Sequence, residues 1–271
     1  MSDQDADNAG SSVGLPLVVL CALIVAFIPL HSCNIQLFSL LNGLHNSVTD
    51  VVWLWFTTMG DGMLIGIMLG CFLLINPRVT CAGLVLMLMS SVLVHAIKFA
   101  YPVPRPVEIV ETAHVVGPVL RWNSFPSGHM ASAFSAATAM ATLMPGRICG
   151  ACALLLAVLI GLSRVFVGAH FPLDILGGAV CALAAFVVMK AGAWKRIQAR
   201  IPDTPRHSSR SFRGLLAVET AAALFSLFVY APRYAESPYA AAVISIGVLV
   251  FLGFGYRKYR RPYPYSSCQK M

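Results

Sequence analysis

The stretch SRVFVGAHFPLD, residues 163–174, lies between two long apolar runs and contains an arginine, a histidine and an aspartate. Charged groups at such a depth are costly, about 2.5–3.5 kcal/mol for an arginine at the bilayer centre even on lenient scales. Gly168 favours the end of one helix, and Pro172 favours the first turn of the next. The spacing therefore predicts that His170 lies in a turn, with Asp174 early in the following helix and within reach of the imidazole.

Each charge in this stretch also has a simpler explanation. Arg164 suits a helix C-terminus and Asp174 suits a helix N-terminus, in both cases because of the helix dipole. Taken singly, these explanations are the better ones. Taken together with the polar clusters described below, the residues indicate a histidine oriented by a carboxylate, beside a cation that binds phosphate.

The composition predicts an all-α integral membrane protein. Hydrophobic residues make up 58% of the 271 residues and charged residues only 11%, whereas soluble domains carry about 25% charged residues. The apolar runs are long enough for membrane-spanning helices. Despite its net charge of +8, the protein is not expected to bind nucleic acid, because most of its basic residues flank apolar runs, where they set membrane topology.

About eight spans are predicted, as a six-helix core followed by two C-terminal helices. The expected spans are 15–30, 51–75, 79–100, 126–144, 148–167, 172–194, 215–230 and 240–256, with an interfacial helix over 34–50. The corresponding domains are a polar N-terminus 1–14, the core 15–194, a basic linker 195–213, the last two spans 214–256, and a basic tail 257–271. Asp61 lies inside the second span and is either functional or hydrogen-bonded to a neighbouring helix. Glu219 lies inside the seventh span and is expected to face other helices.

The basic residues also predict an orientation. With both termini in the cytoplasm, the inner segments hold Arg78, Arg147, Lys190, Lys195, Arg196, Arg200, Arg206, Arg210, Arg213, Arg257, Lys258, Arg260, Arg261 and Lys270. The outer segments hold only Lys98, Arg105, Arg121, Arg164 and Arg233. Because Lys and Arg concentrate on the cytoplasmic side of membrane proteins, this arrangement is the expected one.

Two further polar clusters lie in the outer segments. The first, KFAYPVPRP, runs from Lys98 to Pro106, and the second, PSGH, runs from Pro126 to His129 at the start of a span. A proline can begin that helix, and its first amides would then form an anion site. The predicted orientation places both clusters and the 163–174 stretch on the same side of the membrane.

These three segments resemble the signature of the type 2 phosphatidic acid phosphatase superfamily, which includes bacterial lipid phosphatases, glucose 6-phosphatase and the vanadium haloperoxidases. Its pattern is Lys-x₆-Arg-Pro, then Pro-Ser-Gly-His, then Ser-Arg-x₅-His-x₃-Asp. All eleven defined positions are present at this spacing. The resemblance covers about residues 51–194 and leaves out the last two spans.

The resemblance implies a role for each matching residue. His170 corresponds to the nucleophile that becomes phosphohistidine, Asp174 to the group that orients it, and His129 to the general acid and base. The residues expected to bind the substrate phosphate are Lys98, Arg105, Arg164, Ser127 and Gly128. No metal or other cofactor is expected, because cations and helix amides can stabilise the transferring phosphoryl group.

The expected activity is hydrolysis of a lipid phosphate or diphosphate at the outer face of the membrane. Candidate substrates are undecaprenyl diphosphate, phosphatidylglycerol phosphate, phosphatidic acid and lipid A phosphates. The alternatives are a lipid phosphotransferase using the same site and, less favoured, a non-catalytic lipid-binding or transport protein. The expected location is the bacterial cytoplasmic (inner) membrane, with the site facing the periplasm or exterior.

Overall fold

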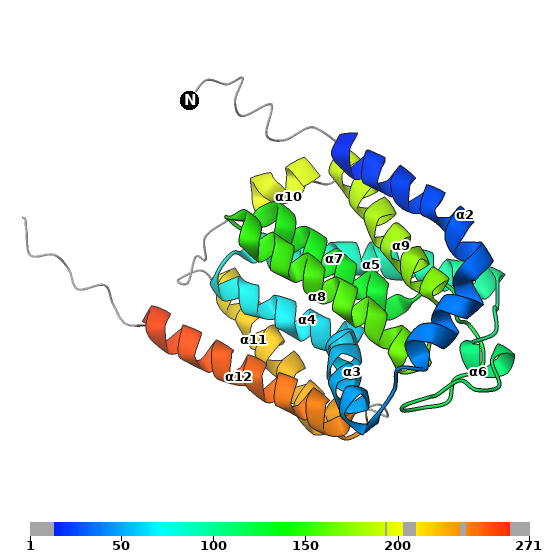
Figure 1. Cartoon of the computed structure of the whole chain (residues 1–271). Helices are drawn as coiled ribbons and strands as arrows, with labels where there is room; N and C mark the ends of the chain where they lie inside the picture. Colours follow the sequence, from blue (N-terminus) through cyan, green and yellow to red (C-terminus); the bar gives the residue numbers. More distant parts are fainter. Residues whose placement is uncertain (1–13, 193, 203–209, 234–236, 261–271) are drawn as a thin grey trace, which may run out of the picture.

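The computed structural model describes residues 14–192, 194–202, 210–233 and 237–260. These residues form helices and no strand, which confirms the predicted all-α class (Figure 1). In chain order the helices are α2 (Gly14–Asn42), α3 (Ser47–Met59), α4 (Gly62–Gly70), η1 (Cys71–Leu74), α5 (Pro77–Ala100), α6 (Pro106–Ile109), α7 (Gly128–Leu143), α8 (Arg147–Phe166), α9 (Pro172–Ala191), α10 (Trp194–Arg200), α11 (Arg210–Phe225), η2 (Ser226–Tyr230), η3 (Ala231–Arg233) and α12 (Pro238–Arg260).

Helix α7 is the centre of the bundle, packed against α5, α8 and α9. Its sequence, GHMASAFSAATAMATL, is rich in alanine, serine and threonine, and small residues let helices approach closely within a membrane. A side chain at Gly150 of α8 would lie 2.8 Å from Cα of Ala141. Between α5 and α7, the hydroxyls of Ser90 and Ser135 lie 3.0 Å apart. This close packing fixes the position of α7, and with it the PSGH cluster at the start of the same helix.

The second predicted span is broken rather than straight. Helix α3 ends at Met59, and α4 begins after Asp61, with an angle of 65° between the two parts. Asp61 is the N-cap of α4, since its Oδ1 accepts hydrogen bonds from the amides of Met63 and Leu64 at 2.9 and 3.2 Å. The carboxylate thus satisfies the amides that a break inside a membrane segment exposes.

The C-terminal helices pack against this broken span, on the opposite side of the bundle from α2 (Figure 1). The Tyr230 hydroxyl donates a 2.8 Å hydrogen bond to Oδ2 of Asp61. Glu219 of α11 is buried, and its carboxyl group lies directly over Gly70, where a Cβ atom would come within 1.8 Å of it. Asp61 is therefore hydrogen-bonded to a neighbouring helix, the second of the two possibilities predicted for it, and Glu219 faces another helix, as predicted.

Several predicted boundaries change. The interfacial helix over 34–50 is wrong, because α2 continues without a break to Asn42 and a short turn then leads into α3. The linker over 195–213 begins as helix α10, and α11 starts at Arg210, before the predicted span. The predicted N-terminus up to residue 13 and the tail beyond residue 260 lie outside the described residues.

Six of the described helices are long and apolar enough to cross a membrane, and the bent pair α3–α4 makes a seventh if counted as one span. The predicted fourth span corresponds to α7, whose 16 residues fall short of the roughly 20 needed to cross the bilayer core. Because α7 is enclosed by other helices, its length need not match the membrane. The arrangement is that of an integral membrane bundle.

Candidate active site

The turn between α8 and α9 carries His170, as the sequence predicts. Gly168 has φ +74°, a left-handed conformation that favours glycine at a helix end. The amides of Ala169 and His170 donate to the carbonyl of Arg164 at 2.9 and 3.0 Å, which closes the turn. A side chain at Gly168 would also lie 2.2 Å from the carbonyl oxygen of His114, so the turn fits closely against the loop that follows α6.

The His170 ring is oriented by Asp174. Nδ1 of His170 lies 3.2 Å from Oδ2 of Asp174, and both side chains are buried. The same oxygen accepts hydrogen bonds from the Ser124 hydroxyl at 2.5 Å and from the Phe171 amide at 2.8 Å. Because an ionised carboxylate can only accept, Nδ1 carries the ring proton and the lone pair is on Nε2. In this tautomer Nε2 is the ring nitrogen whose lone pair is available to attack an electrophile.

His170 is also kept uncharged. Burial is the main cause that lowers the pKa of His170 well below its ordinary value, and the positive charges of Arg105, Arg164 and Lys98 lower this pKa further. A histidine with a depressed pKa remains a neutral imidazole at and below pH 7. The surroundings therefore favour the form that can attack phosphorus.

The three predicted phosphate-binding cations meet around this turn. Arg164 is 2% exposed and donates through Nη1 to the Thr57 hydroxyl of α3. Arg105 donates through Nη1 to the Ala169 carbonyl at 2.9 Å, next to His170. Lys98, at the end of α5, donates to the Asn123 carbonyl at 2.5 Å. Residues separated by more than sixty positions are thus brought to one side of the bundle.

The PSGH cluster completes the site. The Ser127 amide donates to the Asp174 carbonyl at 2.9 Å, which joins the start of α7 to the start of α9. A Cβ atom at Gly128 would have no neighbour within 4 Å, so its backbone borders open space that a substrate could enter. His129 packs against Gly60, at the bend between α3 and α4. A Cβ atom at Gly60 would lie 3.2 Å from Cδ2 of the His129 ring.

Three polar residues in this region were not predicted as site residues. Ser124 bonds to Asp174, Thr57 bonds to Arg164, and Asn42 donates to the carbonyls of Val165 and Phe166 at the end of α8, at 3.2 and 3.0 Å. Of these three residues, Thr57 alone had a signal in the sequence, because residues 57–62 (TTMGDG) form a polar interruption in the predicted span 51–75. His95, three residues before Lys98, is exposed on α5, and its Nδ1 lies 2.8 Å from the Ser91 carbonyl oxygen of the same helix.

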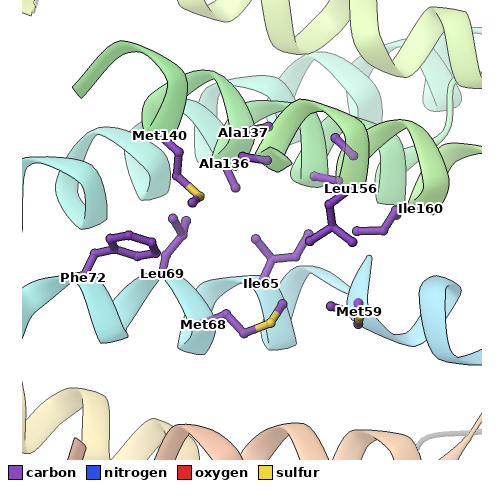
Figure 2. A pocket seen from close by; sticks show the side chains of 13 residues that line it. Met59, Ile65, Met68, Leu69, Phe72, Ala136, Ala137, Met140, Leu156 and Ile160 are labelled. Carbon is purple, nitrogen blue, oxygen red and sulfur yellow. The ribbon is translucent and has the colours of Figure 1, made fainter. Parts of the chain in front are cut away.

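An apolar cavity of about 210 Å³ lies below the site, between α4 and the pair α7–α8 (Figure 2). It begins one helical turn past His129, at Ala133, and extends along α7 to Met140. Met59 and Ile160 line it next to Gly60, the glycine against which His129 packs. The cavity therefore lies next to the site, and its apolar lining suits a hydrocarbon chain.

Comparison with known proteins agrees with this geometry. A family model for the PAP2 superfamily matches residues 79–198. The undecaprenyl-diphosphatase BcrC of Bacillus subtilis (strain 168) is 32% identical over 156 residues, which are 55% of this chain and 79% of that protein. The chain belongs to the PAP2 superfamily. An undecaprenyl-diphosphatase of Sulfolobus acidocaldarius is 28% identical over 149 residues, 54% of this chain and 71% of that protein.

Solved structures of the PAP2 superfamily share the fold. LpxE of Aquifex aeolicus superposes with a TM-score of 0.54 at 30% identity, over 58% of this chain and 94% of that one. The PAP2 type phosphatidylglycerolphosphate phosphatase of Bacillus subtilis superposes with a TM-score of 0.53 at 21% identity, over 68% of this chain and 98% of that one. These findings confirm the prediction of a PAP2-type membrane lipid phosphate phosphatase.

Proposed function

We propose that this enzyme hydrolyses a polyprenyl diphosphate of the undecaprenyl class at the outer face of the membrane, through a phosphohistidine at His170. The observation that carries the proposal is the position of His170, with its Nδ1 3.2 Å from Asp174 and the cations Lys98, Arg105 and Arg164 around its turn. A neutral, oriented imidazole among cations is suited to attack a phosphoryl group.

In the first step, Nε2 of His170 attacks the terminal phosphorus, and the bond from phosphorus to the bridging oxygen breaks. His129 gives a proton to that oxygen, which leaves as the lipid monophosphate. Lys98, Arg105 and Arg164, with Ser127 and the Gly128 amide, stabilise the charge on the equatorial oxygens. Asp174 stabilises the positive charge that develops on the His170 ring.

In the second step, water attacks the phosphorus of phosphohistidine, and His129 accepts a proton from that water. The bond from phosphorus to Nε2 breaks, and orthophosphate leaves. No step requires a metal ion, because the three side-chain cations supply the positive charge. A phosphotransferase would use the same first step and differ in the second, where a lipid hydroxyl would take the place of water.

One observation favours a polyprenyl diphosphate over the other lipid phosphates, and a second is consistent with any long-chain lipid substrate. Both named sequence relatives, from Bacillus subtilis and Sulfolobus acidocaldarius, are undecaprenyl-diphosphatases. The apolar cavity beside His129 also offers a place for part of an isoprenoid chain. Phosphatidylglycerol phosphate, phosphatidic acid and lipid A phosphates remain the comparison substrates for the test.

The distribution of Lys and Arg supports the proposed location. It favours an orientation with both termini in the cytoplasm and the site at the periplasmic or exterior face of a bacterial cytoplasmic membrane. The ends of α5 and α8 and the starts of α7 and α9 form the site together. In the proposed orientation, all of the phosphate chemistry takes place on one side of the membrane.

The deciding experiment measures phosphate release by the purified full-length protein from a panel of lipid monophosphates and diphosphates. The assay contains EDTA, with His170→Ala as the background control. The expected result is the highest kcat/KM for the polyprenyl diphosphate, retained activity in EDTA, and inhibition by vanadate, which resembles five-coordinate phosphorus. Preference for a glycerophospholipid, formation of a labelled lipid instead of phosphate, or a loss in EDTA restored by Mg²⁺ would each contradict part of the proposal.

A further inference from the structure

Outside the reacting residues, three side chains with metal-binding atoms converge near the same end of the bundle. His45 lies in the turn after α2, Asp50 in the first turn of α3, and His114 in the loop between α6 and α7. One ligand atom from each lies within 4.8 Å of the other two. Nε2 of His114 is 3.0 Å from Oδ2 of Asp50. These residues belong to none of the signature motifs.

Two of the three ligand atoms are already spaced as they would be around a bound metal ion. In a tetrahedral site with ligand bonds of about 2.0–2.1 Å, neighbouring ligand atoms are about 3.3 Å apart. Nε2 of His114 and Oδ2 of Asp50, 3.0 Å apart, are already near this separation. The rings of His45 and His114 stack with their centroids 3.8 Å apart and 11° between their planes, so their in-plane lone pairs do not point at one common ion in this arrangement. Coordination by all three residues therefore requires the exposed His45 side chain to rotate out of this stack.

The backbone that carries these ligands is firmly held. The side-chain Nδ2 of Asn42 donates to the His114 carbonyl at 2.9 Å, and the backbone N–H of His114 donates to Oδ1 of Asn42 at 2.8 Å. Asn46 caps α3 by accepting from the amides of Val48 and Thr49, both at 3.0 Å, which fixes the helical turn containing Asp50. A site that is ordered before binding loses little conformational entropy on binding its ligand.

A metal ion also accounts for the chemistry of the cluster. The cluster offers two imidazoles and one carboxylate within reach of one another. As neutral imidazoles they are good ligands for zinc, and two histidines with one carboxylate form a known zinc donor set that leaves a fourth position for water. We propose that His45, Asp50 and His114 form a zinc-binding site.

The position of the cluster suggests what the ion does. The His114 carbonyl lies against Gly168 in the turn that carries His170, and the Val116 amide donates to the Val167 carbonyl at 3.1 Å. Zinc would join the α2–α3 connection to the loop behind this turn. The role proposed for the ion is to hold this loop in place, since His114 lies in the loop while His45 and Asp50 lie in the α2–α3 connection and the first turn of α3. The inference does not depend on which lipid is the substrate.

The test is zinc binding by the purified full-length protein, prepared with a tag that contains no histidine and stripped with EDTA. Isothermal titration calorimetry should show one zinc ion per chain, and elemental analysis after gel filtration should show the same ratio. His45→Ala and Asp50→Asn should each weaken binding at least about 100-fold, since even outer-shell changes cost 10–100-fold. His31→Ala is the matched control, because His31 is exposed on α2 outside the cluster.

A second measurement separates loss of a ligand from loss of the fold. Zinc should raise the Tm of the wild-type protein and of His31→Ala, and it should leave the Tm of His45→Ala unchanged. Phosphatase activity of His45→Ala, measured without zinc, shows that the variant is folded. Absence of stoichiometric binding to the wild-type protein, or equal binding to His45→Ala and His31→Ala, would overturn the proposal.

Discussion

The Ser124 hydroxyl donates a 2.5 Å hydrogen bond to Oδ2 of Asp174, fifty residues later in the chain, and both side chains are buried. The bond holds the carboxylate oxygen that also faces His170. Hydrogen bonds to charged groups contribute about 1.5–3 kcal/mol. Ser124 is therefore a positioning residue for the His170–Asp174 pair.

Replacing Ser124 with alanine should lower kcat about 10–100-fold, because the carboxylate would hold the imidazole less firmly in its reactive tautomer. Steady-state kinetics with the preferred lipid check this. Ser90→Ala is the control, since Ser90 is equally buried but bonds to Ser135 away from the site. Equal losses in the two variants would indicate a general packing effect.

The two histidines should respond differently to the leaving group. His170→Ala should abolish turnover of every substrate, because the proposed nucleophile is needed whatever group leaves. His129→Ala should cost far more with a lipid monophosphate, which expels a basic alkoxide, than with a diphosphate, within the 10²–10⁴-fold range of general acid catalysis. Paired kinetics on both substrate types check this. A gradient for His170→Ala in place of His129→Ala would exchange the two roles.

The buried His170 should make the folded protein less stable in acid. Its pKa is well below the ordinary value, so below about pH 6.5 the unfolded state binds a proton that the folded state does not. The free energy of unfolding should then fall with decreasing pH by up to about 1.4 kcal/mol per pH unit. Thermal unfolding in detergent from pH 7.5 to 5 should show a smaller decrease in Tm for His170→Gln. His31→Gln is the control and should follow the wild-type protein. Parallel curves of Tm against pH for the wild-type protein and His170→Gln would contradict this prediction.

Filling the apolar cavity should impair long-chain substrates selectively. Ala153 lines the cavity, whereas Ala151 on the same helix is exposed on its outer surface. Ala153→Leu should lower kcat/KM for a long polyprenyl diphosphate about tenfold and leave a short-chain diphosphate nearly unchanged, because only the long chain reaches the cavity. Ala151→Leu should affect neither substrate. Equal effects of Ala153→Leu on both chain lengths would place the isoprenoid chain elsewhere.

The proposed orientation predicts the accessibility of introduced cysteines. In a background from which the accessible native cysteines are removed, a cysteine replacing Thr112 should react with an impermeant thiol reagent outside intact cells. A cysteine replacing Ser208, in the basic linker, should react only after the cells are opened. The reverse pattern would place the site on the cytoplasmic side.

The sequence by itself determined the membrane class and the residues of the phosphatase signature. Charged groups such as Lys98 and Arg164 stand out against apolar runs because burying them is costly. The fixed spacing from Arg164 to His170 and Asp174 is local, so the turn between α8 and α9 follows from Gly168 and Pro172. These features need only nearby residues to be understood.

Only the tertiary structure decided which polar residues support the site. Ser124, Thr57 and Asn42 are ordinary polar residues in the sequence, and their partners lie 50, 107 and up to 124 positions away. The break after Gly60 is likewise stabilised by Tyr230, which is 169 positions from Asp61. A hydrogen bond depends on two groups meeting in space, so the packing of the helices around α7 had to be known before these pairs could be assigned.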